Sequence, residues 1–238
     1  QMLERKPRPL EGRLLFDGLW SIERSANFPY ELNIAVTQCD FILGFTESEM
    51  RRSGRLTKAQ KRDRERAESA FGIPPKRSTR NAIAELLRAT VPHFDPSKTE
   101  LWSDEHQEYP RAIRDAGASA IPHNTVSSRA IRDANNPLFP INLADMWVRH
   151  TQSNQKRETI AFSKRRQGGV DRAWLFLSER NYINPRRIKS RDAPPAVQAG
   201  ITTRALTDGE IHSTRIFHDA VRVPAVWERH IRREIVTR

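Results

Sequence analysis

The feature that most restricts the fold is the alternation of polar and apolar residues over positions 31–37. A period of two residues is typical of a β-strand with one buried face. A second apolar run, at residues 41–45, follows Cys39 and Asp40, which we predict to form the turn of an antiparallel hairpin. An earlier apolar run at residues 14–22, interrupted by an aspartate and a glycine, predicts a strand before the hairpin. We therefore expect three strands near the start of the chain.

Helical signals follow the hairpin. Thr57, with Gln60 three residues later, is the capping-box pattern that opens a helix, and Gly72 predicts where this helix ends. Its residues are mostly charged, so we expect most of its surface to be solvated. A second helix is predicted from the apolar face within residues 83–90, and it should stop before Pro92.

The middle of the chain continues as strand, helix, strand and helix. Residues 99–103 predict a short strand that ends at Asp104, and residues 109–116 predict the next helix. Residues 118–121 have a weaker strand pattern, and a helix is expected from about Asn142, with one more helix after it. This order is that of a ribonuclease H-like α/β domain, a mixed sheet flanked by helices, and it also occurs in other mixed folds.

The composition changes beyond Asn184, where arginine and proline become frequent. This composition predicts a basic linker. Two short helices are expected after it, one near residues 207–210 and one near residues 226–231. We therefore predict an α/β domain over residues 1–190, and a linker with a short, mostly helical C-terminal extension over residues 191–238.

The charge of the chain indicates a polyanionic partner. Forty-one Lys and Arg residues stand against twenty-nine Asp and Glu, which gives a formal net charge of +12. Most of the basic residues are arginine, whose planar guanidinium grips phosphate oxygens in pairs. Nucleic acid therefore fits this composition better than a membrane surface, which usually needs an amphipathic helix with exposed apolar residues or a lipid signal.

Cysteine content and hydropathy exclude several classes of protein. Cys39 is the only cysteine in this sequence, so the chain has no intrachain disulfide and no thiolate zinc site. This composition suits a reducing cytoplasm. The longest apolar stretches are far shorter than the roughly 20 residues of a membrane-spanning helix. We expect a cytoplasmic protein that does not span a membrane.

Two aspartates are placed where they can do chemistry together. Asp17 lies in the first predicted strand, and Asp104 lies at the end of a later one. If these strands are neighbours, the two carboxylates can bind a divalent cation through hard oxygen ligands. Sites with two such ions activate an attacking oxygen and stabilise the leaving oxygen of a phosphodiester. A third ligand is normally required.

Four segments carry a family resemblance. They are LLFDGL around Asp17, LWSDEHQEYP around Asp104, NPLFPIN ending at Asn142, and KRETIAFSKRR around Glu158. Together they resemble the DDE-type transposases of small bacterial insertion sequences, from about residue 12 to residue 238. The resemblance implies a ribonuclease H-like catalytic domain that uses two Mg²⁺ or Mn²⁺ ions. It also implies cleavage of DNA at transposon ends and strand transfer into target DNA, with Asp17 and Asp104 as the first two ligands.

The third ligand has three candidates. The resemblance places Asn142 at the position where many family members have glutamate and some have asparagine. An amide oxygen can ligate a hard cation, but Asn142 followed by Asp145 is also a helix-capping pattern. Glu158 supplies a carboxylate, or it pairs with a basic neighbour within a helix. Asp145 is the third candidate, because it lies one helical turn after Asn142.

Basic residues near these acids are expected to neutralise DNA phosphates on either side of the cleaved bond. The candidates for this DNA-binding groove are Lys156, Arg157, Lys164, Arg165 and Arg166. A second cluster, Arg51, Arg52 and Arg55, follows the predicted hairpin. Any one of these charges is more often solvated than in contact with a ligand.

The resemblance also implies partners and a location. Transposon ends and target DNA would be bound by a homodimer or a larger synaptic assembly at the bacterial nucleoid. Family members usually carry an upstream zinc-ribbon or helix-turn-helix module, and we expect any such module to lie outside this chain. Two alternatives stay open, an inactive fragment that binds DNA and a ribonuclease H-like nuclease that cleaves without joining strands.

Overall fold

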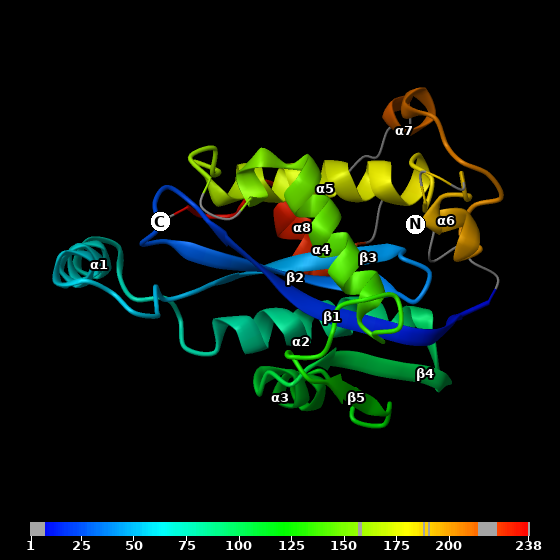
Figure 1. Ribbon diagram of the computed structural model, residues 1–238, viewed down its shortest axis with the longest axis horizontal. Helices are drawn as coiled ribbons and strands as arrows, with labels where there is room; N and C mark the ends of the chain where they lie inside the picture. Colours follow the sequence, from blue (N-terminus) through cyan, green and yellow to red (C-terminus); the bar gives the residue numbers. More distant parts are fainter. Residues whose placement is uncertain (1–7, 157–158, 188, 190, 214–222, 238) are drawn as a thin grey trace.

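A computed structural model describes residues 8–156, 159–187, 189, 191–213 and 223–237. It contains one mixed five-stranded sheet with helices on both faces (Figure 1). The strands are β1 (Leu10–Ile22), β2 (Pro29–Thr37), β3 (Ile42–Glu49), β4 (Phe94–Asp104) and β5 (His123–Val126), in the spatial order β3-β2-β1-β4-β5. β2 is antiparallel to both β1 and β3, whereas β4 is parallel to both β1 and β5. The fold class is therefore α/β.

The described helices vary widely in length and position. The longer ones are α1 (Lys58–Phe71), α2 (Ser78–Thr90), α3 (Glu108–Asp115), α4 (Phe139–Thr151) and α5 (Arg166–Tyr182). Shorter ones are α6 (Pro195–Gln198), α7 (Asp208–Ser213), α8 (Ala225–Ile231), and the 3₁₀ turns η1 (Val91–His93) and η2 (Ser153–Gln155). Among the described residues, no helix combines the length and the apolar character needed to cross a membrane.

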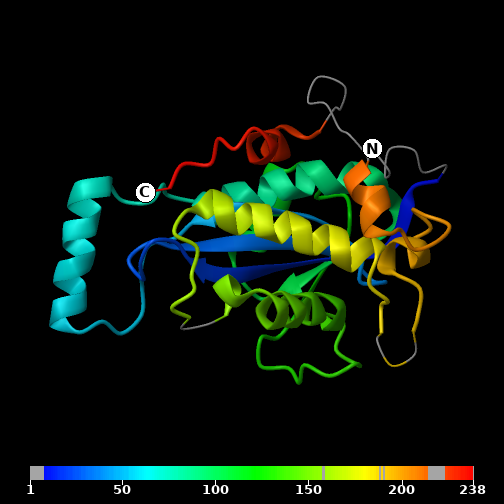
Figure 2. The same cartoon turned by 90° about the horizontal axis from the view of Figure 1, so that it is seen from above.

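The sheet separates two hydrophobic layers, because successive side chains of a strand point to opposite faces. On β1, Leu14 and Phe16 belong to the layer formed with α2 and α3, while Leu15 and Leu19 belong to the layer formed with α4 and α5. Figure 2 shows the helices on both sides of the sheet. Each residue of β1 is thus assigned to one face by its position in the alternation.

Most predicted elements are present. The hairpin of β2 and β3 is confirmed, with Asp40 in a left-handed conformation (φ 66°) at its turn. The capping box that opens α1 is confirmed, because the Thr57 and Gln60 side chains each accept a hydrogen bond from the other residue's backbone N–H. The predicted apolar face of α2 is also confirmed, since Leu86 and Leu87 are fully buried.

The strand predicted at residues 118–121 is wrong. The backbone of this segment closes turns after α3, because the Ala118 N–H donates to the Ile113 carbonyl and the Ile121 N–H donates to the Ala118 carbonyl. Ala118 and Ile121 are buried, which explains their apolar character without a strand. The strand that pairs with β4 follows directly, as β5.

The C-terminal extension packs on the same core as the α/β domain. Ala196 of α6 and Trp227 of α8 are buried in the layer with α2 and α3. The Trp227 indole Nε1 donates a hydrogen bond of 2.9 Å to the Phe45 carbonyl in β3. His230 of α8 forms a 2.6 Å hydrogen bond with the Glu47 carboxylate. The helical character predicted for this extension is confirmed, and α8 is held against β3 by both packing and hydrogen bonds.

The contact between Trp227 and β3 requires a glycine at position 44. A Cβ atom built on Gly44 would overlap the Trp227 ring. We expect Gly44→Ala to lower the free energy of unfolding by about 1–3 kcal/mol, the usual cost of overpacking a core. Gly168→Ala is the matched control, because the same atom at Gly168 in α5 meets open space. Urea denaturation of both proteins tests this, and equal stability of the two variants would contradict it.

Candidate active site

The two predicted aspartates lie on adjacent parallel strands. β1 and β4 pair with Leu14 opposite Leu101 and Leu15 opposite Trp102. Two residues further along this register, Asp17 is level with Asp104. Asp17 alternates in phase with Leu15, whose side chain lies in the layer with α4 and α5. The expectation that the two aspartates sit on neighbouring strands is therefore confirmed.

Local hydrogen bonds orient both carboxylates. One oxygen of Asp17, Oδ1, accepts a hydrogen bond of 2.7 Å from the Gly18 backbone N–H. In Asp104, Oδ1 accepts a hydrogen bond of 2.9 Å from the His106 backbone N–H, at the turn that leads to α3. Backbone donors of this kind fix the orientation of a carboxylate without neutralising its charge.

Asp145 brings a third carboxylate from α4. Burial, and to a smaller extent the negative charge of Asp17, raise its pKa to about 8. Burial likewise raises the pKa of Asp17 to about 6, with Asp104 contributing in the same direction. The Oδ1 atom of Asp145 is buried and has no hydrogen-bond partner among the described residues. The acids from β1, β4 and α4 therefore lie close enough for electrostatic repulsion between their carboxylates.

Glu31 of β2 interacts electrostatically with this group from the other face of the sheet, the face that α2 covers, and the sequence pattern did not single it out. Burial, and to a smaller extent the charges of Asp17 and Asp104, raise its pKa to about 7. Its carboxyl group occupies the space that a side chain at position 18 would fill, because a Cβ atom built on Gly18 would overlap Glu31. The glycine beside Asp17 was the available signal, since it permits this close approach.

Positive charge near the acids comes from two arginines. Arg132 and Arg149 both lower the pKa of Asp17 and of Asp145. Their effect is smaller than that of burial, which is the leading cause of both shifts. The group of carboxylates is thus only partly compensated by cations of the protein.

The donor set suits a hard divalent cation, because Asp17, Asp104 and Asp145 all offer carboxylate oxygens. The buried, unpartnered oxygen of Asp145 is a further sign of a missing partner. Within the part of the chain that the structure describes, no three His, Cys, Asp or Glu side chains are arranged closely enough to hold an ion as they stand. Binding would require these carboxylates to move closer together.

The other candidates for the third ligand have different positions. Asn142 lies in the first turns of α4, and its N–H donates to the carbonyl of Leu138, which is the N-cap residue. The capping interpretation of Asn142 is therefore wrong, because the helix begins earlier than predicted. Glu158 lies outside the described residues, as does the basic candidate Arg157.

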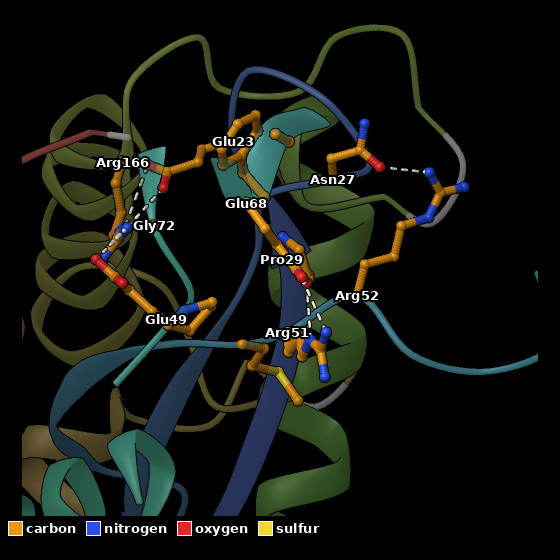
Figure 3. Close-up of a pocket in the computed structure, with 13 residues that line it drawn as sticks. Glu23, Asn27, Pro29, Glu49, Arg51, Arg52, Glu68, Gly72 and Arg166 are labelled. Atoms are coloured by element: carbon orange, nitrogen blue, oxygen red, sulfur yellow. Dashed lines mark hydrogen bonds and ion pairs between the residues drawn. The ribbon is translucent and has the colours of Figure 1, made fainter. Parts of the chain in front are cut away.

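The remaining basic candidates divide into exposed and buried side chains. Lys156, Lys164 and Arg165 are exposed, as a DNA-binding groove would require. Arg166 is only 5% exposed, and its guanidinium lies 2.6 Å from the Glu23 carboxylate and 2.9 Å from that of Glu49 (Figure 3). Arg166 is therefore neutralised inside the protein, and the prediction that it faces DNA does not fit this placement.

A cluster of half-buried carboxylates near Arg132 and Arg149 can bind divalent cations and present them to a phosphate group. Asp17 and Asp104 were predicted as a pair, and Asp145 was the third choice for the remaining ligand. Glu31, on the other face of the sheet, was not predicted. The comparisons with known proteins find no family model and no curated protein that matches this chain.

Proposed function

We propose that this chain is a DDE-type DNA transposase in which Asp17, Asp104 and Asp145 are the carboxylate ligands of two Mg²⁺ or Mn²⁺ ions. The observation that carries the proposal is that the charge of Asp104 raises the pKa of Asp17 and the charge of Asp17 raises the pKa of Asp145, together with the buried, unpartnered oxygen of Asp145. Neighbouring buried carboxylates are unfavourable unless protons or cations neutralise them. A divalent-metal site is the simplest reason to keep them together.

The topology supports the same proposal. The strand order β3-β2-β1-β4-β5, with β2 antiparallel to β1, is compatible with a ribonuclease H-like fold. The first and fourth strands carry Asp17 and Asp104, which are the positions that the family resemblance implies. The helix that follows β5 carries Asp145, and Asn142 lies one turn before it. Asn142 is therefore retained as an additional ligand candidate.

The proposed reaction has two phosphodiester steps. Water first cleaves the strand at a transposon end, which releases a 3′ hydroxyl group. This hydroxyl then attacks a target phosphodiester in line and displaces the 3′ oxygen of the target strand. When bound, divalent ions supply Lewis acidity and lower the pKa of the attacking water. The backbone N–H groups of Gly18 and His106 orient the Asp17 and Asp104 carboxylates that would hold the ions. The exposed Lys164 and Arg165 hold the flanking phosphates.

A second candidate function is DNA binding without catalysis. It is favoured by the finding that no complete metal site exists among the described residues, while the chain carries a net charge of +12. Such a protein would bind DNA with the steep salt dependence of phosphate contacts and would cleave nothing. A nuclease that cleaves without joining strands is the third outcome, and one assay separates all three.

The test uses a plasmid that carries the gene for this chain with its flanking DNA, so that natural transposon ends are present. We expect nicked and joined products with Mg²⁺ or Mn²⁺ and none with EDTA. An Asp104→Asn protein purified in the same way controls for contaminating nuclease. Binding without products under every divalent ion would indicate an inactive protein, and nicking without joined products would indicate a nuclease.

A further inference from the structure

The segment that joins β3 to α2 holds more than half of the net charge of the chain. We define residues 51–77 as the α1 arm. It contains ten Lys and Arg residues and three acidic residues, a net formal charge of +7 out of the +12 of the whole chain. This excess makes the α1 arm the most strongly basic part of the molecule. A surface of this kind is the electrostatic footprint of a nucleic-acid contact.

The α1 arm makes no contribution to the core. No residue of α1 is buried, and the helix stands apart from both layers of the molecule (Figures 1 and 2). In proteins, most of the stability of a helix comes from packing an apolar face against the core. A helix without such a face is therefore expected to have a function other than stabilising the fold. The fold of the sheet therefore does not explain why this segment exists.

The base of the α1 arm is nevertheless fixed to the body of the protein. Within the arm, Arg51 donates two hydrogen bonds, of 2.7 and 2.9 Å, to the carboxylate of Glu68, which fixes α1 against the start of the arm. Arg52 donates a hydrogen bond of 2.6 Å to Asn27 in the loop after β1 (Figure 3). Surface ion pairs add little stability, but paired and bidentate contacts fix geometry. The helix is thus held in a defined direction.

Aromatic contacts hold the C-terminal end of α1 against the same loop. The Phe71 ring meets the Phe28 ring edge to face, with their centroids 5.4 Å apart. The Arg24 guanidinium lies 4.4 Å from the centroid of the Phe71 ring. This loop joins β1, which carries Asp17, to β2, which carries Glu31. The α1 arm is therefore anchored next to β1, which supplies Asp17 to the proposed active site, and to β2, which pairs with β1.

One face of α1 carries cations that are free of ion pairs. Lys58, Lys61 and Arg62 are exposed, and none of them forms an ion pair with a described residue. Their spacing of three and four residues places them on one side of the helix. At about 1.5 Å per residue, the row from Lys58 to Arg62 extends about 6 Å along the helix axis, and duplex DNA carries one negative charge per about 1.7 Å of axis. This row of cations can follow several phosphates.

We propose that the α1 arm is a second DNA-binding surface, which holds the phosphate backbone away from the catalytic carboxylates through Lys58, Lys61 and Arg62. The inference extends the proposed transposase function and rests on DNA being the substrate. Charge complementarity selects this partner. A second copy of the chain would carry the same net charge of +12 and the same basic arm, so the two arms would repel each other. The negative phosphates of DNA attract the arm and neutralise its charge.

The test compares two triple variants that remove the same charge. The first is Lys58→Gln with Lys61→Gln and Arg62→Gln, which leaves the anchoring contacts intact. The matched control is Arg8→Gln with Arg114→Gln and Arg172→Gln, three exposed arginines outside the α1 arm that form no ion pair with described residues. Dissociation constants for a 30-base-pair duplex are measured in EDTA over a range of NaCl concentrations.

We expect the slope of log affinity against log salt to become shallower by about 2–3 in the arm variant, because each lost phosphate contact removes about 0.9. The control should keep the wild-type slope. Equal slopes for the two variants would overturn the proposal, as would a change in oligomeric state of the arm variant without a change in slope. DNA binding in EDTA does not require cleavage. A failure of the plasmid assay would therefore contradict the transposase proposal without affecting the result of this binding test.

Discussion

We expect the Asp145→Asn protein to lose more than about 100-fold of its metal-dependent cleavage rate, since the loss of an outer partner of a ligand alone costs about 10–100-fold. The amide keeps the size of the side chain but removes the negative charge that a divalent cation needs. DNA binding in EDTA should be retained, because the phosphate contacts come from basic residues. Initial rates of plasmid nicking with Mn²⁺ measure the effect.

The same substitution should make the metal-free protein more stable at high pH. The pKa of Asp145 is raised from 3.8 to about 8 in the folded state, so the folded state binds this proton more tightly than the unfolded state. Stability is therefore lost as pH rises from about 4 to about 8, and the full penalty is present above pH 8. We expect Asp145→Asn to gain about 1–3 kcal/mol at pH 9 and nothing at pH 4. This gain is smaller than about 1.4 kcal/mol for each unit of the pKa shift, because Asp145 is only half-buried and solvent screens its charge. Urea denaturation with EDTA measures this gain.

Two further variants identify the third ligand. Asn142→Ala and Glu158→Gln should each keep most of the cleavage rate if Asp145 is the carboxylate ligand. A loss in Glu158→Gln as large as that expected for Asp145→Asn, with Asp145→Asn active, would transfer the role to Glu158. An Asp145→Asn protein that gains stability at pH 9 but cleaves at the wild-type rate would show a buried acid without a catalytic role.

A second large effect is expected at Arg166. Its guanidinium is the shared partner of Glu23, which is 1% exposed, and of Glu49. Removing one member of a buried ion pair leaves an uncompensated charge, so we expect Arg166→Met to lower the free energy of unfolding by about 3–5 kcal/mol. Arg165→Met, which changes the exposed neighbour, should stay within about 0.5 kcal/mol of wild type.

A double variant separates the charge effect from lost packing. In Arg166→Met with Glu23→Gln, one of the stranded carboxylates becomes neutral, so part of the lost stability should return. Thermal denaturation of the two proteins makes the comparison. Equal stability of the single and the double variant would mean that the pair with Glu23 contributes nothing, and that packing alone accounts for the loss.

Local patterns predicted the elements well where the pattern and the packing agree. The period of two in β2 and the capping box of Thr57 and Gln60 are properties of neighbouring residues, and both are present in the structure. The strand predicted at residues 118–121 failed because burial in turns and burial in a strand give the same short apolar pattern. Periodicity alone does not separate these two cases.

The candidate site depended more on contacts between distant parts of the chain. Asp17 and Asp104 were recognisable because each lies in a strand with its own local signal. Glu31 was not, because its role depends on the pairing of β2 with β1 and on the space left by Gly18. Arg166 was predicted to bind DNA because it lies in a run of basic residues. Its ion-pair partner, Glu23, lies 143 residues away in the sequence. Spacing along the chain carries no information about such pairs.

Because α1 buries no side chain, its outward face is free of the packing constraints that limit change in the sheet and in the helices that cover it. Substitutions at Lys58, Lys61 or Arg62 alter charge without altering the core. Related chains could therefore diverge quickly along this helix while the acidic residues of β1 and β4 stay the same. If α1 binds DNA, substitutions on its outward face would change the DNA contacts, whereas the acidic residues of β1 and β4 would stay constant.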